Sequence, residues 1–213
     1  MPETVSGLQD AIVNEASFDV TPTQALAWIN RRWRSMVGRA RAYRKTLTVG
    51  TTTANVAFYP LTGVLEVYEV TVAGIPYSRG RRGDPYFNTQ GELAWTGMGE
   101  GRGLFVPDAN ASATRGVTLV PTPADTGSAI SAFAALEPPD LTADSTGDTL
   151  LAAVIDGEFV EALIAGAMAI GYRREGNLGL ARDNDQMFDS GSDEFMRITR
   201  RRYRGPGPTQ IRV

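Results

Sequence analysis

Apolar residues recur at helical spacing in two segments near the start of the 213-residue chain, residues 3–17 and 21–44. The second segment opens with Thr21-Pro22-Thr23-Gln24, which is typical of a capping box with proline in the first helical turn. Its apolar stripe spans about 100° of arc and is formed by Leu26, Ile29, Trp33, Met36, Val37 and Ala40. The pattern predicts an N-terminal helix pair within residues 1–45, in which Trp33 belongs to the core and Trp28 faces outward.

The period then shortens to the alternation expected of β-strands. Stretches rich in Val, Thr, Tyr and Phe predict strands at 46–49, 55–61, 65–77, 103–107, 116–121 and 128–136. Residues 78–103 are polar and dense in glycine, which indicates one or two long loops around a short strand near residues 92–95. Residues 46–136 are therefore predicted to form an antiparallel β-module, whose first three strands follow one another in the sheet.

Helical spacing returns after a turn-rich connector at residues 137–149. We expect Asp156 to cap a helix that ends near Arg174, and a second helix to follow the Gly176-Asn177 break and end near Arg204. Small residues on the first of these helices predict close packing with its neighbours. The predicted apolar stripe of the second helix is Leu180, Asn184, Met187, Phe188, Gly191, Phe195, Ile198 and Thr199.

A Gly-Pro-Gly-Pro run at residues 205–208 ends the last helix and leaves a short tail. The patterns together predict one α+β chain. Its helical core consists of the N-terminal helix pair and a C-terminal helical hairpin at residues 150–204. The β-module at 46–136 is inserted between them, and residues 205–213 form an extended tail.

The composition narrows the possible functions. The chain has no cysteine and no histidine, which removes disulfides, thiolate sites, the commonest general base and the commonest transition-metal ligand. We therefore expect no catalytic residues, no metal site and no cofactor. The longest apolar stretch, residues 162–172, is too short to span a bilayer, and no signal peptide is visible, so the sequence predicts a soluble protein.

The charges are divided along the chain although the formal net charge is only −3. Residues 20–65 contain no Asp or Glu, whereas residues 116–172 contain no Lys or Arg. If these blocks lie on opposite sides of the fold, the basic side of one copy can meet the acidic side of the next, as in a ring. The alternative is that both blocks are solvated surface.

The order of segments resembles a known family. A short helix pair precedes FYPLTGVLEVYEVTVAGIPY at residues 58–77, and DGEFVEALIAGAMAIGYRREGNLGLARDNDQMFDSGSDEFMRITRR follows at residues 156–201. This order is similar to that of the head-to-tail connector (adaptor) proteins of tailed bacteriophages. In that family a Tyr-x-Leu-Pro-like turn introduces a Val-rich strand, and an Ala-rich helix precedes an Arg/Gly/Asn break and a second helix. The chain departs from the family in reading Pro60-Leu61 at the turn and in its longer insert at residues 78–136.

The resemblance implies a structural virion protein of the neck, assembled in the host cytoplasm. It implies a homo-oligomeric ring, usually of twelve copies, that joins the portal protein to a stopper or tail-completion protein. Double-stranded DNA would pass through the channel and make only transient, non-specific contacts with the ring. No membrane partner is implied.

Two sets of residues are predicted to make these contacts. Subunit or portal contacts are expected from Arg31, Arg34, Arg41, Asp185, Asp189, Asp193, Arg200, Arg201, Arg202, Gln210, Ile211, Arg212 and Val213. The three aspartates lie at i, i+4 spacing and would repel one another, so we hypothesise that arginines of a neighbouring subunit balance them. Contacts with DNA or the stopper are expected from Arg79, Arg81, Arg82 and Arg102.

Two other classes of function remain open at this point. A nucleic-acid-binding module would use the basic helix at residues 22–44 against phosphates, with Trp28 available for stacking. A glycosidase could act through Asp and Glu alone. The acidic remainder of the chain weighs against the first, and the absence of an evident aromatic cleft weighs against the second.

Overall fold

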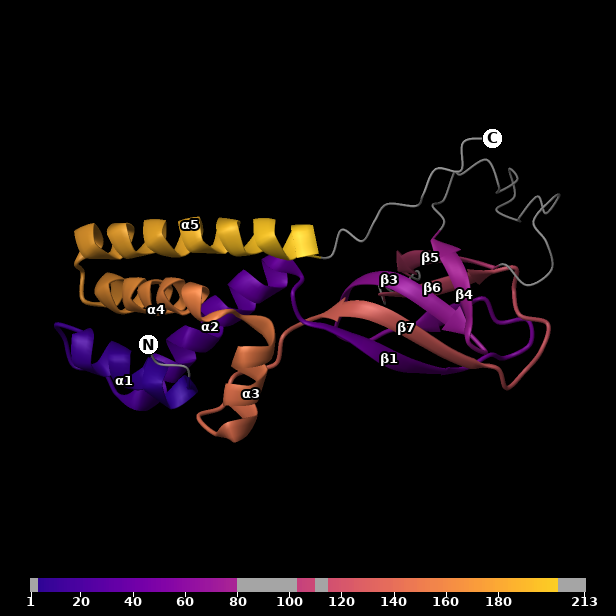
Figure 1. The fold of residues 1–213 in the computed structure, drawn as a ribbon, viewed down its shortest axis with the longest axis horizontal. Coiled ribbons are helices and arrows are strands. Elements are labelled where there is room, and N and C mark those ends of the chain that lie inside the picture. The colour runs from indigo at the N-terminus through magenta and orange to yellow at the C-terminus, as the bar shows by residue number, and fades with distance from the viewer. Residues whose placement is uncertain (1–3, 80–102, 110–114, 203–213) are drawn as a thin grey trace. The chain divides into compact units, whose positions relative to one another are not determined.

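A computed structural model describes residues 4–79, 103–109 and 115–202 (Figure 1). The chain divides into two compact units. The helical unit is built from residues 1–43 and 138–213, and the β unit from residues 44–137. The combination of helices with a separate sheet confirms the predicted α+β class.

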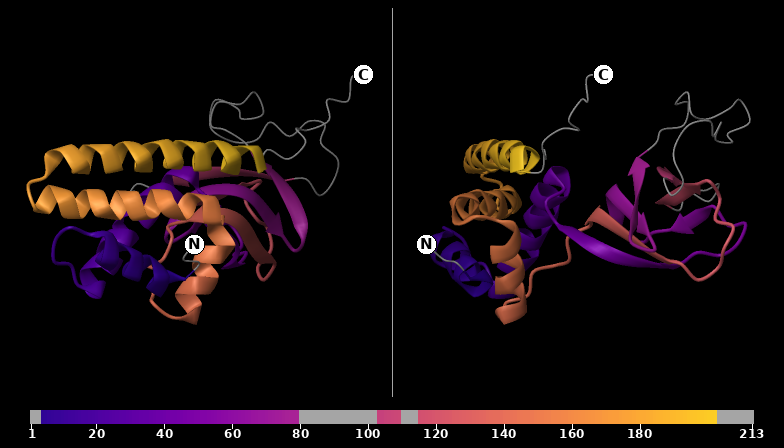
Figure 2. Two further views of the ribbon diagram at one scale, coloured as in Figure 1. Left: turned by 60° about the vertical axis from the view of Figure 1, so that its left-hand side comes forward. Right: turned by 45° about the vertical axis from the view of Figure 1, so that its right-hand side comes forward.

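The helical unit contains five α-helices among its described residues. They are α1 (Val5–Glu15), α2 (Pro22–Ala40), α3 (Ser145–Val154), α4 (Val160–Arg174) and α5 (Leu178–Arg202), and a short 3-10 helix at Gly157–Phe159 precedes α4. Helices α4 and α5 form an antiparallel hairpin and lie side by side in all three views (Figures 1 and 2). Helix α2 packs against both of them, and α1 packs against α2 and α4.

Helix α2 begins with the predicted capping box. The Thr21 hydroxyl accepts the backbone N–H of Gln24, and the Gln24 side chain accepts the backbone N–H of Thr21. Trp33 is fully buried, and its Nε1 donates to the carbonyl of Pro139 at 2.9 Å. The expectation that Trp28 faces outward is wrong, because its ring is half-buried and packs 6.2 Å from the ring of Phe18.

Glycines set the close spacing of the helical hairpin. A Cβ on Gly191 would lie 2.5 Å from the Cβ of Ala162, and a Cβ on Gly166 would lie 2.6 Å from the ring of Phe188. A side chain at either position would force its neighbour to shift, because atoms at that distance overlap. The prediction of close packing through small residues is confirmed.

The helical unit also departs from the predictions. Helix α3 begins inside the predicted connector and runs into the span predicted for the hairpin, residues 150–204, and the sequence pattern did not reveal it. Asp144 caps it by accepting the backbone N–H groups of Thr146 and Gly147. Asp156 makes no capping hydrogen bond and instead pairs with Arg202.

The buried face of α5 follows the predicted stripe only in part, because Phe188, Phe195 and Thr199 of that stripe are buried and other members are not. The residues of α5 that are buried are Ala181, Phe188, Ser192, Phe195 and Thr199. Leu180 and Met187, which were predicted to be apolar core positions, are 41% and 58% exposed. They lie on one edge of the hairpin because Ala181 and Phe188, one residue further along, take the central positions against the rest of the unit.

The β unit holds one seven-stranded sheet among its described residues. The strands are β1 (Arg44–Thr51), β2 (Phe58–Pro60), β3 (Val64–Val72), β4 (Ile75–Arg79), β5 (Leu104–Ala109), β6 (Arg115–Val120) and β7 (Ala129–Leu136). Their order in the sheet is β1-β7-β3-β4-β5-β6-β2. Valines of β3 pack with Phe105, Leu119 and Ile130 to form its core.

The sheet corrects three expectations about the β-module. The predicted strand at 65–77 is a hairpin, because Ala73 and Gly74 both adopt positive φ and turn the chain between β3 and β4. The sheet is mixed, since β4 and β5 run parallel. The first three strands do not pair in chain order, because β7 lies between β1 and β3. The predicted strand near residues 92–95 and the predicted tail lie outside the described residues.

No helix in the described part of the chain is long and apolar enough to cross a membrane.

Candidate functional site

A charged cluster joins three helices at the centre of the helical unit. Nη2 of Arg32 on α2 donates to Oδ1 of Asp185 on α5 at 2.5 Å. Arg173 on α4 forms a second ion pair with the same carboxylate. Nε of Arg32 donates to the carbonyl of Gly166 on α4 at 2.9 Å, and the guanidinium lies 4.7 Å from the ring centroid of Phe188. The cluster therefore couples α2, α4 and α5 through one arginine.

The surroundings of Arg32 disfavour its positive charge in two ways. Burial lowers the pKa of Arg32, and the neighbouring positive charge of Arg173 lowers it further. Arginine remains protonated at neutral pH in spite of such a shift, because its ordinary pKa lies far above neutral pH. Asp185 thus has two cations from its own chain and does not need a neighbouring subunit to balance its charge.

The other arginines of α2 are partly engaged in the same way. Arg34 makes a two-pronged contact with Asp140, and that hydrogen bond raises the pKa of Arg34. Arg39 lies 3.9 Å from Asp189. Arg31 is exposed and forms no ion pair with any described residue, and Arg41 is the exposed residue that ends α2. The basic run read from the sequence is therefore not a continuous cationic surface.

The second half of α5 carries charges of both signs. Arg197 pairs with Glu194 at 2.5 Å, and Arg202 pairs with Asp156 at 2.6 Å. Asp193, Arg200 and Arg201 are exposed and make no ion pair within the described parts of the chain. Their role in subunit or portal contact stays a prediction.

The expected contacts of the loops and tail are mostly outside the described residues. Arg79 ends β4 and lies 3.3 Å from Glu66. Arg81, Arg82 and Arg102, and the tail residues Gln210, Ile211, Arg212 and Val213, are not among the described residues.

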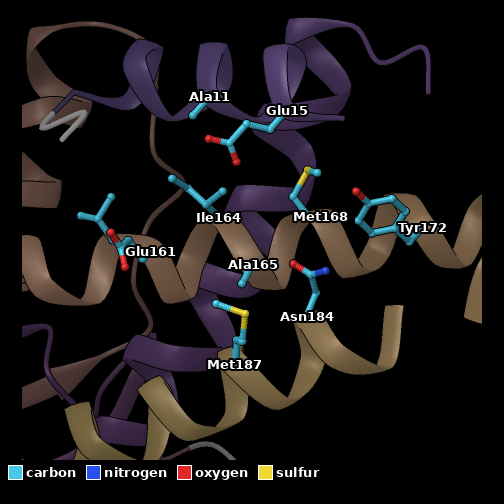
Figure 3. A pocket seen from close by; sticks show the side chains of 10 residues that line it. Ala11, Glu15, Glu161, Ile164, Ala165, Met168, Tyr172, Asn184 and Met187 are labelled. Carbon is cyan, nitrogen blue, oxygen red and sulfur yellow. The ribbon is translucent and has the colours of Figure 1, made fainter. Parts of the chain in front are cut away.

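The helical unit also carries a groove that was not predicted from the sequence. It has a volume of about 400 Å³ and lies between α1, α4 and α5. Figure 3 shows Ile164 and Met168 of α4 and Met187 of α5 around the opening, with Glu15 reaching in from α1 and Glu161 at one end. The groove thus combines apolar walls with carboxylates.

A second hollow of about 630 Å³ shares Glu161 and Met187 with this groove and adds Glu158 and Asp183. Among the described residues, no Lys or Arg lines either hollow. The carboxylates of Glu15, Glu158, Glu161 and Asp183 form no ion pair within the described residues. We call the two hollows together the acidic groove. Glu158 and Glu161 lie in the acidic block of the sequence, which was the one available signal for this surface.

No group of three or more Asp, Glu, His or Cys side chains in the described residues could hold a metal ion. The shifted pKa values belong to structural ion pairs, a helix cap and a tyrosine of the β unit, Tyr77, whose pKa is raised by burial.

A known protein family matches nearly the whole chain. The model of a family described as SU10 adaptor protein matches residues 3–212. No curated protein matches the chain.

Proposed function

The chain belongs to the SU10 adaptor protein family, and from that membership we propose that it forms a homo-oligomeric ring joining the portal to the stopper or tail. The family is a structural one of bacteriophages, so the chain is a virion component of the head–tail region that associates with other phage head or tail proteins. The proposal adds that the ring is dodecameric and that it lines the channel through which DNA leaves the capsid.

One observation carries the ring proposal. Among the described residues, the helical unit bears cations with no ion pair, including Arg31 and Arg200, and an acidic groove whose four carboxylates likewise have none. Opposite charges at different places on one protomer support a heterologous contact, in which each copy offers one patch to the next. Such a contact closes into a ring when the rotation between successive copies is a whole-number fraction of a full turn with no rise along the axis, and otherwise builds an open filament.

The pairing of the α2 arginines supports a channel lining that does not hold DNA. Arg32, Arg34 and Arg39 are each next to a carboxylate of the same chain. Affinity for a duplex grows with the number of phosphates that free cations neutralise. A surface whose arginines are already paired would let DNA slide through rather than bind it, as an exit channel requires.

Mass photometry of the purified chain, alone and with the portal of the same phage, tests the proposal. We expect a ring, or a ring that forms on the portal, and electron microscopy of that complex gives its copy number. A chain that stays monomeric under both conditions would contradict the proposal.

The same sample tests the alternative, a nucleic-acid-binding module that uses the helix at residues 22–44. Tight duplex binding that weakens steeply with salt would favour this alternative over a channel lining. Weak binding at physiological salt is the result that we expect.

A further inference from the structure

The acidic groove is built to receive a segment that is both apolar and cationic. Met187 is 58% exposed at its edge, and Ile164 and Met168 form apolar wall beside it. Exposed apolar surface next to a hollow is typical of a binding site, since covering it removes that surface from water. The four carboxylates around it repel one another and attract positive charge.

The chain contains a segment of matching chemistry immediately after α5. Residues 203–213, with the sequence YRGPGPTQIRV, include Arg204 and Arg212 and contain no acidic residue. Ile211 and Val213 flank Arg212, so an extended segment would present two apolar side chains on one side and one cation on the other. The apolar pair matches the walls of the groove, and the long arginine side chain can reach its carboxylates.

We infer that residues 203–213 of one copy bind in the acidic groove of a second copy. The inference rests on the proposed ring, and it names the contact between adjacent subunits. Because the segment leaves the end of α5 while the groove lies toward the beginning of that helix, the contact repeats from copy to copy in one direction.

The reach of the segment favours a second copy over the same chain. Met187 and Arg202 are separated by about 22 Å along α5, at 1.5 Å per residue. The segment extends to at most about 36 Å, at 3.3 Å per residue. To reach the groove of its own chain, the segment must first reverse direction after α5. The residues left after that turn would have to be almost fully extended to span the distance back to Met187. A neighbouring copy imposes no such constraint.

The absence of cysteine from the chain allows a direct test. One batch of the full chain carries Met187→Cys and an affinity tag, and a second batch carries Ile211→Cys and a fluorescent tag. The batches are mixed and mildly oxidised, and non-reducing electrophoresis measures the disulfide-linked product that bears both tags. We expect a strong product, because docking raises the local concentration of the two thiols far above that in solution.

Arg182→Cys provides the matched control, since Arg182 is exposed on α5 and does not line the groove. We expect at least about tenfold less product from this variant than from Met187→Cys. Equal yields would show random collision and overturn the inference. A chain carrying both Met187→Cys and Ile211→Cys that closes only an internal disulfide would show the segment in its own groove and would also overturn it.

Charge reversal identifies the chemistry of the contact. Adding Glu161→Arg to the batch that carries Met187→Cys should reduce the disulfide-linked product that bears both tags. Adding Arg212→Glu to the batch that carries Ile211→Cys should then restore it. Failure of the second change to restore the product, with helix content unchanged by circular dichroism, would count against the charge pairing.

Mass photometry of the unmodified chain separates this inference from the proposed function. Rings without the mixed disulfide would refute the tail-in-groove contact and leave the ring proposal standing. The absence of rings, with or without the portal, would refute the proposed function itself.

Discussion

Asn30 fastens α2 to the segment that leads into α3, and its replacement tests how the helical unit is held together. Its Nδ2 donates to the carbonyl of Leu141 at 3.0 Å, and its Oδ1 accepts the backbone N–H of Leu141 at 2.7 Å. Asn30 is 8% exposed and Leu141 is 1% exposed. One side chain therefore satisfies both backbone groups of a buried residue.

Asn30→Ala leaves both backbone groups of Leu141 without a partner. A buried polar group that loses its hydrogen bond costs about 1–3 kcal/mol. Two such groups would cost about 2–6 kcal/mol, and water entering the vacated space reduces the upper end, so we expect a loss of about 2–5 kcal/mol in the free energy of unfolding. That is a large part of the roughly 5–15 kcal/mol that stabilises an ordinary domain.

Urea unfolding followed by circular dichroism at 222 nm measures this loss, because all five described α-helices belong to the helical unit. Asn184→Ala is the matched control. Its side chain also donates to a backbone carbonyl, that of Leu180 at 2.9 Å, but this hydrogen bond is exposed to solvent. We expect a loss below about 1 kcal/mol for the control. Equal losses for the two variants would refute the argument that burial of the Leu141 backbone sets the cost.

Asn30→Asp tests the direction in which stability changes with pH. The carboxylate cannot donate to the carbonyl of Leu141, whereas the protonated acid can. Burial raises the folded-state pKa of such an acid, so the variant should lose stability as the pH rises through that value and regain it at low pH. A stability deficit relative to the unaltered chain that does not shrink as the pH decreases would contradict this account.

Three further changes probe other contacts of the helical unit. Arg32→Met should lower the free energy of unfolding, measured by urea unfolding, by about 1–3 kcal/mol, because it removes the hydrogen bonds to Gly166 and Asp185. A loss that vanishes in 1 M salt would show instead that Arg32 forms only a solvent-screened surface ion pair. Gly191→Ala should lower the melting temperature by forcing α4 and α5 apart, and Ala162→Gly should restore it; no restoration would refute the contact. The pKa of Asp144 is lowered in the folded state, chiefly by the hydrogen bond from the backbone N–H of Gly147. The stability that this carboxylate contributes is therefore present above a pH of about 3.9 and is lost as the pH falls through the lowered pKa. Acid titration of Asp144→Asn should therefore show a smaller loss of stability in that range than the unaltered chain, and identical curves would contradict the assignment.

Much of the fold follows from local signals in the sequence. The capping box at Thr21 and the change from helical to alternating spacing located α2 and β1 to within a few residues. The hairpin between β3 and β4 was missed because its turn uses Ala73 at positive φ, where Asn, Asp or Gly is the usual signal. Helix α3 was missed because only Gly147 and Leu151 of its ten residues are buried. Its periodicity is therefore too weak to distinguish it from a connector.

The periodicity of the sequence does not determine which face of α5 is buried. The sets Leu180–Met187 and Ala181–Phe188 both repeat at seven residues, so either can form an apolar stripe. Gly166 decides between them, because its missing side chain leaves room for the ring of Phe188. That choice depends on a residue of α4, which the sequence of α5 alone does not contain.

The charged surface is the feature that could least be predicted from the sequence. Arg32 and Asp185 are 153 positions apart, and Arg34 and Asp140 are 106 apart, so no local pattern indicates that they pair. The sequence offers a run of arginines and a run of acids, whereas a partner meets only the charges that remain after internal pairing. In the described residues the remainder includes Arg31 on α2 and the carboxylates of the acidic groove. In the proposed ring, the contacts between subunits use this remainder, so reversing Glu161 should disturb assembly more than reversing Asp185, which should first disturb folding.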